Sequence, residues 1–399
     1  METQLPDLPV ARIFSFLDPF SLLQVSQVNK CWNRIAGSDH LWRTLYLKRW
    51  GVCNLTSEKL GTQTWKQLFL HQTKAERQMA LARPDDFICR AVTADLEIFE
   101  EVAYLSRNDF TVDGQKRSIV CVVSSKCMFY TLDVQEVGDS GGDIYAFALP
   151  GLKNISKVNA FQHSVNLLHC SPDKKWVFAC GIHEHILPKV FLAESLLKPS
   201  EDSVPLSLEL PCTSCCSACW TPRAESRITL MFQRGADKAM GFTTFDLATK
   251  STEGHTVIRA HQVANFQLAV GVRSPLQMAA AAEGLIVCTS GLYLFLFTID
   301  GLQLQQLQHH QTLIVNLWVD SLHVLTASMD DSLHVYMWEE KGGCPYLKSS
   351  MQLMNTYFSF LTDSCFFSCW SAICDNVSIV HMVSNYAKFS NVVMYSLHM

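Results

Sequence analysis

The sequence predicts a small all-α segment, a helical connection and a large all-β domain. Residues 1–83 contain short amphipathic helical patterns, whereas the residues after Pro84 contain many short strand patterns. The charge changes at the same point: residues 1–83 carry 11 Lys/Arg and 6 Asp/Glu, and the remainder carries 21 and 31. We therefore expect an all-α domain at 1–50, a helical linker at 51–84 and an all-β domain at 85–399.

Composition excludes several classes of protein. Hydrophobic residues make up 48% and charged residues 17%, which is unlike a disordered chain. The net charge of −5 is too mild for a nucleic-acid binder. The first ten residues, METQLPDLPV, lack the basic start of a signal peptide, so we expect most of the 16 cysteines to be buried and reduced, in a protein of the cytoplasm or nucleus.

The helical patterns have recognisable starts and stops. One apolar stripe at helical spacing contains Val10, Ile13, Phe14 and Leu17. Asp18-Pro19 predicts the start of the next helix, since Asp caps free N–H groups and Pro suits the first turn. Gly37 predicts a helix end. The last helix is expected over Thr64–Ala82 and stops before Pro84, which cannot continue it.

The β domain is predicted from short apolar runs separated by Gly, Pro, Asp and Ser, with no long amphipathic helix between them. The expected strands include Ser118–Val123, Met128–Val134, Leu167–Cys170, Trp176–Cys180, Ile228–Gln233, Gly241–Leu247, Leu285–Thr289, Tyr293–Ile299, Val315–Val319, His323–Ala327, Leu333–Trp338 and Val377–Val383.

Three stretches of the β domain resemble one another. They start at His163, Cys219 and His310, and each contains a strand, a turn and a second strand. A unit of about 40–45 residues is typical of a four-stranded propeller blade, and residues 85–399 accommodate seven such units. The sequence therefore predicts an antiparallel β-propeller of seven degenerate blades.

Met278–Ile299 is apolar and long enough to cross a membrane. However, it contains Glu283 and has no basic flank. We therefore interpret it as two buried strands with a turn at Ser290-Gly291.

Residues 5–46 resemble an F-box. The matching residues are Leu5-Pro6, Leu8-Pro9, Ile13-Phe14, Phe16-Leu17, Leu22-Leu23, Val25-Ser26, Val28, Lys30, Trp32, Ala36 and Leu41-Trp42. The resemblance implies that this domain binds the Skp adaptor of a ubiquitin ligase. It assigns adaptor binding to Leu5, Pro6, Leu8, Pro9, Ile13, Phe14, Leu17, Leu22, Leu23, Val28, Trp32, Leu41 and Trp42. The alternative is that the helices only cap the β domain.

The β domain resembles WD repeats more weakly, because Trp-Asp dipeptides are absent. Gly254-His255 resembles a blade start and Phe245-Asp246 a degenerate Trp-Asp pair. In the best blade, the resemblance implies a hydrogen-bonded chain that includes a buried Asp330 and consists of His310, Ser328, Asp330 and Tyr336. The order of F-box, linker and propeller is that of the F-box/WD-repeat family.

The substrate surface is not defined by a motif. Related propellers use clustered arginines to bind phosphorylated motifs, since guanidinium pairs bidentately with phosphate. The candidates here are Arg223, Arg227, Arg234, Arg259 and Arg273.

Two clusters resemble metal sites only superficially. Cys212, Cys215, Cys216 and Cys219 lie within eight residues, which leaves little chain to encircle a zinc ion. His183-Glu184-His185 and His309-His310 lack further ligands at plausible spacing. We expect no metal and no cofactor. No HExxH, GxSxG, P-loop or dinucleotide motif indicates an enzyme.

The resemblance implies a non-catalytic receptor of an SCF-type ubiquitin ligase, linked through the Skp adaptor to cullin and RING subunits. The propeller is then expected to bind an unknown protein substrate, and neither nucleic acid nor a membrane span is expected. One alternative is a propeller scaffold whose F-box engages no ligase. Another is a zinc- or membrane-associated protein built on Cys212–Cys219 or Met278–Ile299.

Overall fold

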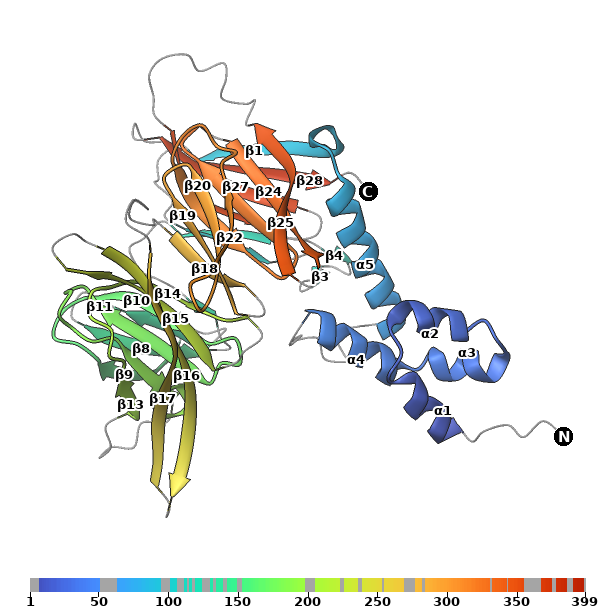
Figure 1. The fold of residues 1–399 in the computed structure, drawn as a ribbon, viewed down its shortest axis with the longest axis horizontal. Helices are drawn as coiled ribbons and strands as arrows, with labels where there is room; N and C mark the ends of the chain where they lie inside the picture. Colours follow the sequence, from blue (N-terminus) through green and yellow to red (C-terminus); the bar gives the residue numbers. More distant parts are fainter. Residues whose placement is uncertain are drawn as a thin grey trace. The chain divides into compact units, whose positions relative to one another are not determined.

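The computed structural model describes most of the helices and strands (Figure 1). The described residues are 7–50, 63–94, 101–105, 111–112, 115–116, 119–123, 130–131, 134–138, 142–148, 153–197, 205–222, 226–235, 239–252, 255–268, 277–281, 284–330, 332–342, 344–354, 367–374, 378–385 and 390–397. The chain divides into two compact units. The first is Met1–Ala82 with Thr111–Lys116, and the second is Arg83–Phe110 with Arg117–Met399.

The first unit is helical, as its sequence predicts. Its helices are α1 (Asp7–Phe14), α2 (Pro19–Val25), α3 (Lys30–Ala36), α4 (Asp39–Trp50) and α5 (Trp65–Leu81), and it includes the hairpin of β3 (Thr111–Val112) and β4 (Gln115–Lys116). Asp18 caps α2 by accepting from the N–H groups of Phe20 and Ser21. Thr64 begins α5 with a capping box, which satisfies N–H groups that the helix itself leaves unpaired.

The helices share one apolar core that includes α5. Trp42 is fully buried, and its indole N–H donates to the carbonyl of Ala36 at 2.7 Å. Its ring lies 5.3 Å from that of Phe69 in an edge-on arrangement, and Trp65 and Leu68 are buried in the same cluster. The linker helix therefore completes the core that the first four helices are too small to build alone.

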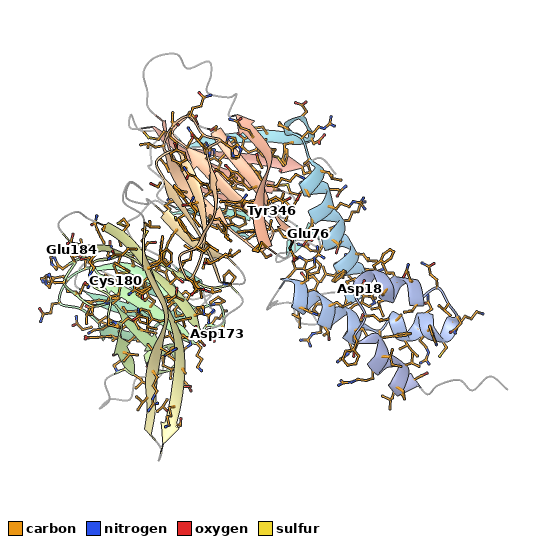
Figure 2. The ribbon with its side chains drawn as sticks, in the orientation of Figure 1. Asp18, Glu76, Asp173, Cys180, Glu184 and Tyr346 are labelled. Atoms are coloured by element: carbon orange, nitrogen blue, oxygen red, sulfur yellow. The ribbon has the colours of Figure 1, made fainter. Side chains whose placement is uncertain are left out.

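A buried carboxylate joins α4 to α5. Glu76, labelled in Figure 2, accepts hydrogen bonds from the indole of Trp50 and from Arg49, the latter at 2.7 Å. Only 5% of the Glu76 side chain is exposed, against 45% of Arg49. A charge this deeply buried is tolerated only with such partners.

Replacing Glu76 with Ala is expected to destabilise the helical unit by about 2 kcal/mol, because the half-buried indole N–H of Trp50 and the guanidinium of Arg49 lose their acceptor. Glu76→Gln keeps an acceptor and should cost less. Denaturant unfolding followed by helical circular dichroism measures both variants. Equal stability of Glu76→Ala and the parent chain would contradict this anchor.

The second unit contains most of the predicted strands, arranged as antiparallel sheets. One sheet contains β6 (Tyr130–Thr131), β7 (Val134–Gly138), β8 (Asp143–Ala148) and β9 (Lys153–Asn159). The next contains β10 (Val165–Cys170), β11 (Trp176–Gly181), β12 (Lys189–Leu192) and β13 (Ser207–Glu209), with helix α6 (Ala193–Leu197) after β12. The third contains β14 (Cys215–Trp220), β15 (Arg227–Arg234), β16 (Ala239–Thr252) and β17 (His255–Gln267).

Three further four-stranded sheets follow. They contain β18 (Gln277–Ala281), β19 (Leu285–Ser290), β20 (Tyr293–Thr298) and β21 (Gln303–Leu307); β22 (Ile314–Val319), β23 (His323–Ser328), β24 (Ser332–Lys341) and β25 (Cys344–Met354); and β26 (Phe367–Cys374), β27 (Ser378–Asn385) and β28 (Ser390–Leu397) with β1 (Phe87–Ala94). β2 (Glu101–Leu105) pairs with β5 (Ile119–Val123), and a 3-10 turn, η1 (Pro84–Asp86), precedes β1.

The sheets form a β-propeller. The first strands of successive sheets contact one another, from β10 to β14, β18, β22, β26 and then β2. Each sheet is thus covered on its two faces by the sheets before and after it. As a result, β11, β19 and β23 are buried along their whole length. β1 pairs with β28 from Phe87↔Leu397 to Ala94↔Ser390, so the two ends of the domain share one sheet. If the pair of β2 and β5 is counted as one blade, the described strands form seven blades.

Three details differ from the sequence interpretation. Met128–Val134, expected as one strand, covers β6 and the first residue of β7, and these two strands pair with each other. Met278–Ile299 covers parts of three strands, β18, β19 and β20, rather than two, although the turn at Ser290-Gly291 is present. His255 starts β17, the last strand of its sheet, rather than a new blade. Its neighbour Gly254 lies outside the described residues. The hydrophobic pattern alone does not show where one strand ends or where a new blade begins, because no helical segment marks the start of a blade.

The blade that starts at His310 contains the predicted polar network, with additional bridging residues. Nδ1 of His310 lies 3.0 Å from Oγ of Ser332, and Nε2 lies 2.7 Å from Oγ1 of Thr326. Oδ1 of Asp330 accepts from Ser328 and from Ser332. Tyr336 lies 3.2 Å from Nδ1 of His309 instead of contacting His310 directly.

Asp330 is exposed, so the expectation that it is buried is wrong. It sits at the end of β23, where the chain turns and solvent reaches the carboxylate. Partial desolvation raises its pKa, but hydrogen bonds from Ser328 and Ser332 outweigh this and hold the pKa below its usual value.

Asp330→Ala is expected to destabilise the propeller by about 1 kcal/mol, because the hydroxyls of Ser328 and Ser332 lose an acceptor. Asp300, exposed in a turn and without a side-chain hydrogen bond to any described residue, is the matched control. Asp300→Ala should stay within about 0.5 kcal/mol of the parent. Thermal melts that rank the two variants equally would show that the network adds nothing to stability.

Candidate functional site

The first unit exposes large apolar side chains between α1 and α3. Exposed fractions are 84% for Leu8, 54% for Ile13, 76% for Phe16, 69% for Phe20 and 61% for Val28. Five such residues within 21 positions are unusual for a surface that water is to cover, and exposed apolar side chains of this size are candidates for contact with a partner. We call these five residues the apolar face.

Local sequence positions this face. α1 has a period of 3.6 residues, so Val10 and Phe14 enter the core while Leu8 and Ile13 turn outward. Asp18 then fixes the start of α2 by accepting from the N–H of Phe20 at 2.9 Å. Asp7 pairs with Arg34 of α3, and the hydrogen bond from Arg34 lowers the pKa of that carboxyl. The face thus lies on elements that capping and ion pairing hold in place.

The residues predicted to bind an adaptor divide into groups. Phe14, Leu22, Leu41 and Trp42 are buried in the core of the unit. Leu17, Leu23 and Trp32 are half-buried against it. Leu8, Pro9, Ile13 and Val28 are exposed, whereas Leu5 and Pro6 lie outside the described residues. In this conformation only the exposed and half-buried side chains are accessible to a partner.

Two members of the face, Phe16 and Phe20, were absent from the predicted set. A sequence signal was present, because Phe14, Phe16 and Phe20 lie within seven positions. Phe14 packs against Trp32 with ring centroids 5.5 Å apart. Residues two apart in a helical pattern point to opposite sides, so Phe16 faces away from the core that holds Phe14.

The candidate arginines are not brought together. Arg227 starts β15 and makes a bidentate pair with Asp246, at 2.6 and 2.8 Å. Arg234 ends the same strand, about 23 Å further along at the usual rise per residue. Arg259 lies on β17 opposite Ala248, and Arg223 and Arg273 lie outside the described residues. The described arginines therefore form no single phosphate-binding cluster.

Cysteines of the predicted cluster are divided between two apolar clusters. Cys212 and Cys215 share an apolar cluster with Cys180 of β11, whose thiol lies 3.9 Å from the carbonyl of Cys215. Cys219 packs on the neighbouring cluster, where burial raises its pKa to about 12. Burial likewise raises the pKa of Cys216 to about 11.

The histidine candidates occupy two places. His183 contacts His163 and His185, with ring centroids 4.4 and 5.6 Å apart. His309 and His310 belong to the polar network of their blade. Across the described ranges, no three His, Cys, Asp or Glu side chains are arranged to hold a metal ion. In the same ranges, no helix is long and apolar enough to cross a membrane.

Known proteins resemble this chain both in its helical unit and over its whole length. An F-box-like family model matches residues 3–48. The chain is 48% identical to F-box/WD repeat-containing protein 12 of Homo sapiens, with 100% of each chain covered. It is 31% identical to F-box/WD repeat-containing protein 15 of Mus musculus, covering 100% of this chain and 99% of that one. The crystal structure of the Myceliophteria thermophila Cps50 (Swd1) β-propeller domain is similar at TM-score 0.45 and 8% identity, over 64% of this chain and 78% of that one.

Proposed function

Because the chain belongs to the F-box/WD-repeat family, we propose that it is a substrate receptor of an SCF-type ubiquitin ligase. The F-box binds the Skp adaptor, the adaptor links it to cullin and RING subunits, and the propeller binds a protein substrate. The receptor itself is non-catalytic. The observation that carries this proposal is the apolar face, which stays exposed although the core beneath it is complete.

The apolar face is not needed for folding of the helical unit. The core is closed by Trp42, Trp65 and Phe69, and none of the five exposed residues belongs to it. Exposing such side chains to water has no benefit for an isolated domain, since each would gain about 1.5–3 kcal/mol on full burial. A partner that covers them recovers this free energy as binding.

The linker helix supports a receptor role. α5 is packed into the F-box core through Trp65, Leu68 and Phe69, and Glu76 fixes it to α4. The segment that leaves the F-box is therefore a rigid helix rather than a flexible Gly/Ser chain. A receptor acts by proximity, because holding substrate beside a ubiquitin-charged enzyme makes the transfer effectively intramolecular.

Reconstitution tests the proposal. The full chain is mixed with purified Skp adaptor, cullin and RING subunits and separated by size-exclusion chromatography. We expect one complex that contains all four proteins. Failure to bind the adaptor would support the alternative, a propeller scaffold without a ligase.

A further inference from the structure

A pocket of about 610 Å³ lies between two neighbouring sheets of the propeller. One wall is the turn between β10 and β11, with Lys174 and Lys175, and another is Glu194 after β12. The third wall is the β16–β17 hairpin, which extends past the rest of its sheet (Figure 1). The hairpin lines the pocket with the hydroxyl-bearing residues Thr249, Ser251 and Thr256.

Both sides of the pocket are held in place by hydrogen bonds. Ser171 accepts from the N–H of Trp176 at 2.9 Å, and Asp173, labelled in Figure 2, accepts from the N–H of Lys175 at 3.1 Å. Lys175 extends over the ring of Trp176, 5.2 Å from its centroid. Across the hairpin, Oγ of Ser251 lies 3.1 Å from Oγ1 of Thr256.

The charge of the pocket is opposite to that of its domain. The residues from Pro84 onward carry 21 Lys/Arg against 31 Asp/Glu, yet the pocket has two lysines and one glutamate. Three hydroxyl groups add uncharged hydrogen-bond donors. The two ammonium groups attract an anionic oxygen ligand as point charges, and the net negative charge of the surrounding domain favours a singly charged ligand over a dianion.

We propose that this pocket binds an acidic segment of a protein partner, with an aspartate or glutamate carboxylate between the two lysines and the hydroxyl groups. The inference rests on the proposed role of the propeller as the substrate-binding part, and it specifies the class of substrate. Nucleic acid is a poorer fit, because the surrounding acidic domain repels a phosphate backbone.

Peptide binding to the full chain tests this inference. Three fluorescein-labelled dodecapeptides are compared by fluorescence polarisation: alternating glutamate and serine, alternating glutamine and serine, and the glutamine peptide with one phosphoserine. We expect saturable binding of the glutamate peptide and at least about tenfold weaker binding of the glutamine peptide. No saturable binding of the glutamate peptide, or tighter binding of the phosphopeptide, would overturn the proposal.

Matched variants locate the site. Lys175→Gln should weaken the glutamate peptide about tenfold, whereas Lys250→Gln, on the same hairpin but outside the pocket, should leave it unchanged. Glu194→Gln should tighten binding, because it removes a like charge from the wall. Equal effects of Lys175→Gln and Lys250→Gln, or weaker binding by Glu194→Gln, would refute the assignment.

Adaptor binding by the same variants separates the two proposals. We expect it to be unchanged in all three variants. Peptide binding without any adaptor binding would leave the pocket assigned and the ligase role refuted. Adaptor binding without peptide binding would refute the pocket alone.

Discussion

Joint replacement of Ile13, Phe16 and Phe20 with Ala is expected to abolish adaptor binding while the protein stays folded. Removing a central interface anchor typically costs about 2 kcal/mol or more, so three together should weaken binding by more than about a thousandfold. Because all three side chains are exposed, the free energy of unfolding should change little. Surface-immobilised adaptor measures the binding, and thermal melts measure the stability.

Two control variants distinguish binding from folding. Leu302→Ala removes an apolar side chain of the propeller that is 64% exposed and should not affect the adaptor. Trp42→Ala should destabilise the helical unit by about 3–5 kcal/mol, because it removes a fully buried ring, and should lose adaptor binding through unfolding. Full adaptor affinity in the triple variant would exclude the apolar face as the interface.

Acidification is expected to destabilise the propeller between pH 6.5 and 4. Burial lowers the pKa of His169, His310, His334 and His381 to about 4. For His310, the neighbouring His334 lowers the pKa further and Asp330 opposes the shift. Unfolding exposes these rings to water, where they take up a proton near pH 6.5.

The decrease in stability on acidification follows from proton uptake by the unfolded state. Between pH 6.5 and 4 the unfolded state binds more protons than the folded state, so stability falls as the pH falls. Each histidine contributes up to about 3 kcal/mol over this window and nothing further below pH 4. Urea unfolding at steps of half a pH unit from pH 7.5 to 4 measures how the free energy of unfolding changes with pH.

A variant can assign part of this slope to one ring. Both nitrogens of His334 are buried and have no hydrogen-bond partner among the residues that the structure describes. His334→Phe should therefore reduce the change of stability with pH by the contribution of one protonating histidine. His40, exposed on α4, is the control, and His40→Gln should change nothing. A stability that is flat between pH 7 and 5 would contradict the low pKa values.

Local sequence patterns predicted the secondary structure well where short-range interactions decide it. The capping residue Asp18 and the helix-ending Pro84 give bounds within about two residues of the observed helices, and α5 spans Trp65–Leu81 where Thr64–Ala82 was expected. Strands such as β11 were also recognised, because a strand buried on both faces has a continuous apolar run. Blade starts were harder, as His255 shows, because successive strands in one blade have similar patterns.

The residues of the candidate adaptor site were predicted only in part, because burial depends on how the helices pack. The F-box resemblance identified α1 and α2, but it could not separate Ile13, which is exposed, from Phe14, which is buried beside it. That separation depends on which face of α1 packs against α3. Phe20 was missed because its exposure depends on the cap at Asp18 and on the absence of a covering helix among the described residues.

The sequence by itself determined the helical unit, the all-β class and the family, because these depend on periodicity, capping and motif residues close together in the chain. Only the tertiary structure decided which distant segments meet: β1 with β28, Cys180 with Cys215, and Lys175 with Ser251 across a pocket. These pairings join residues separated by 35 to several hundred positions, where the order of sheets and the strand register set the geometry. No local pattern encodes that geometry, since the backbone hydrogen bonds of a strand can be made with any antiparallel neighbour.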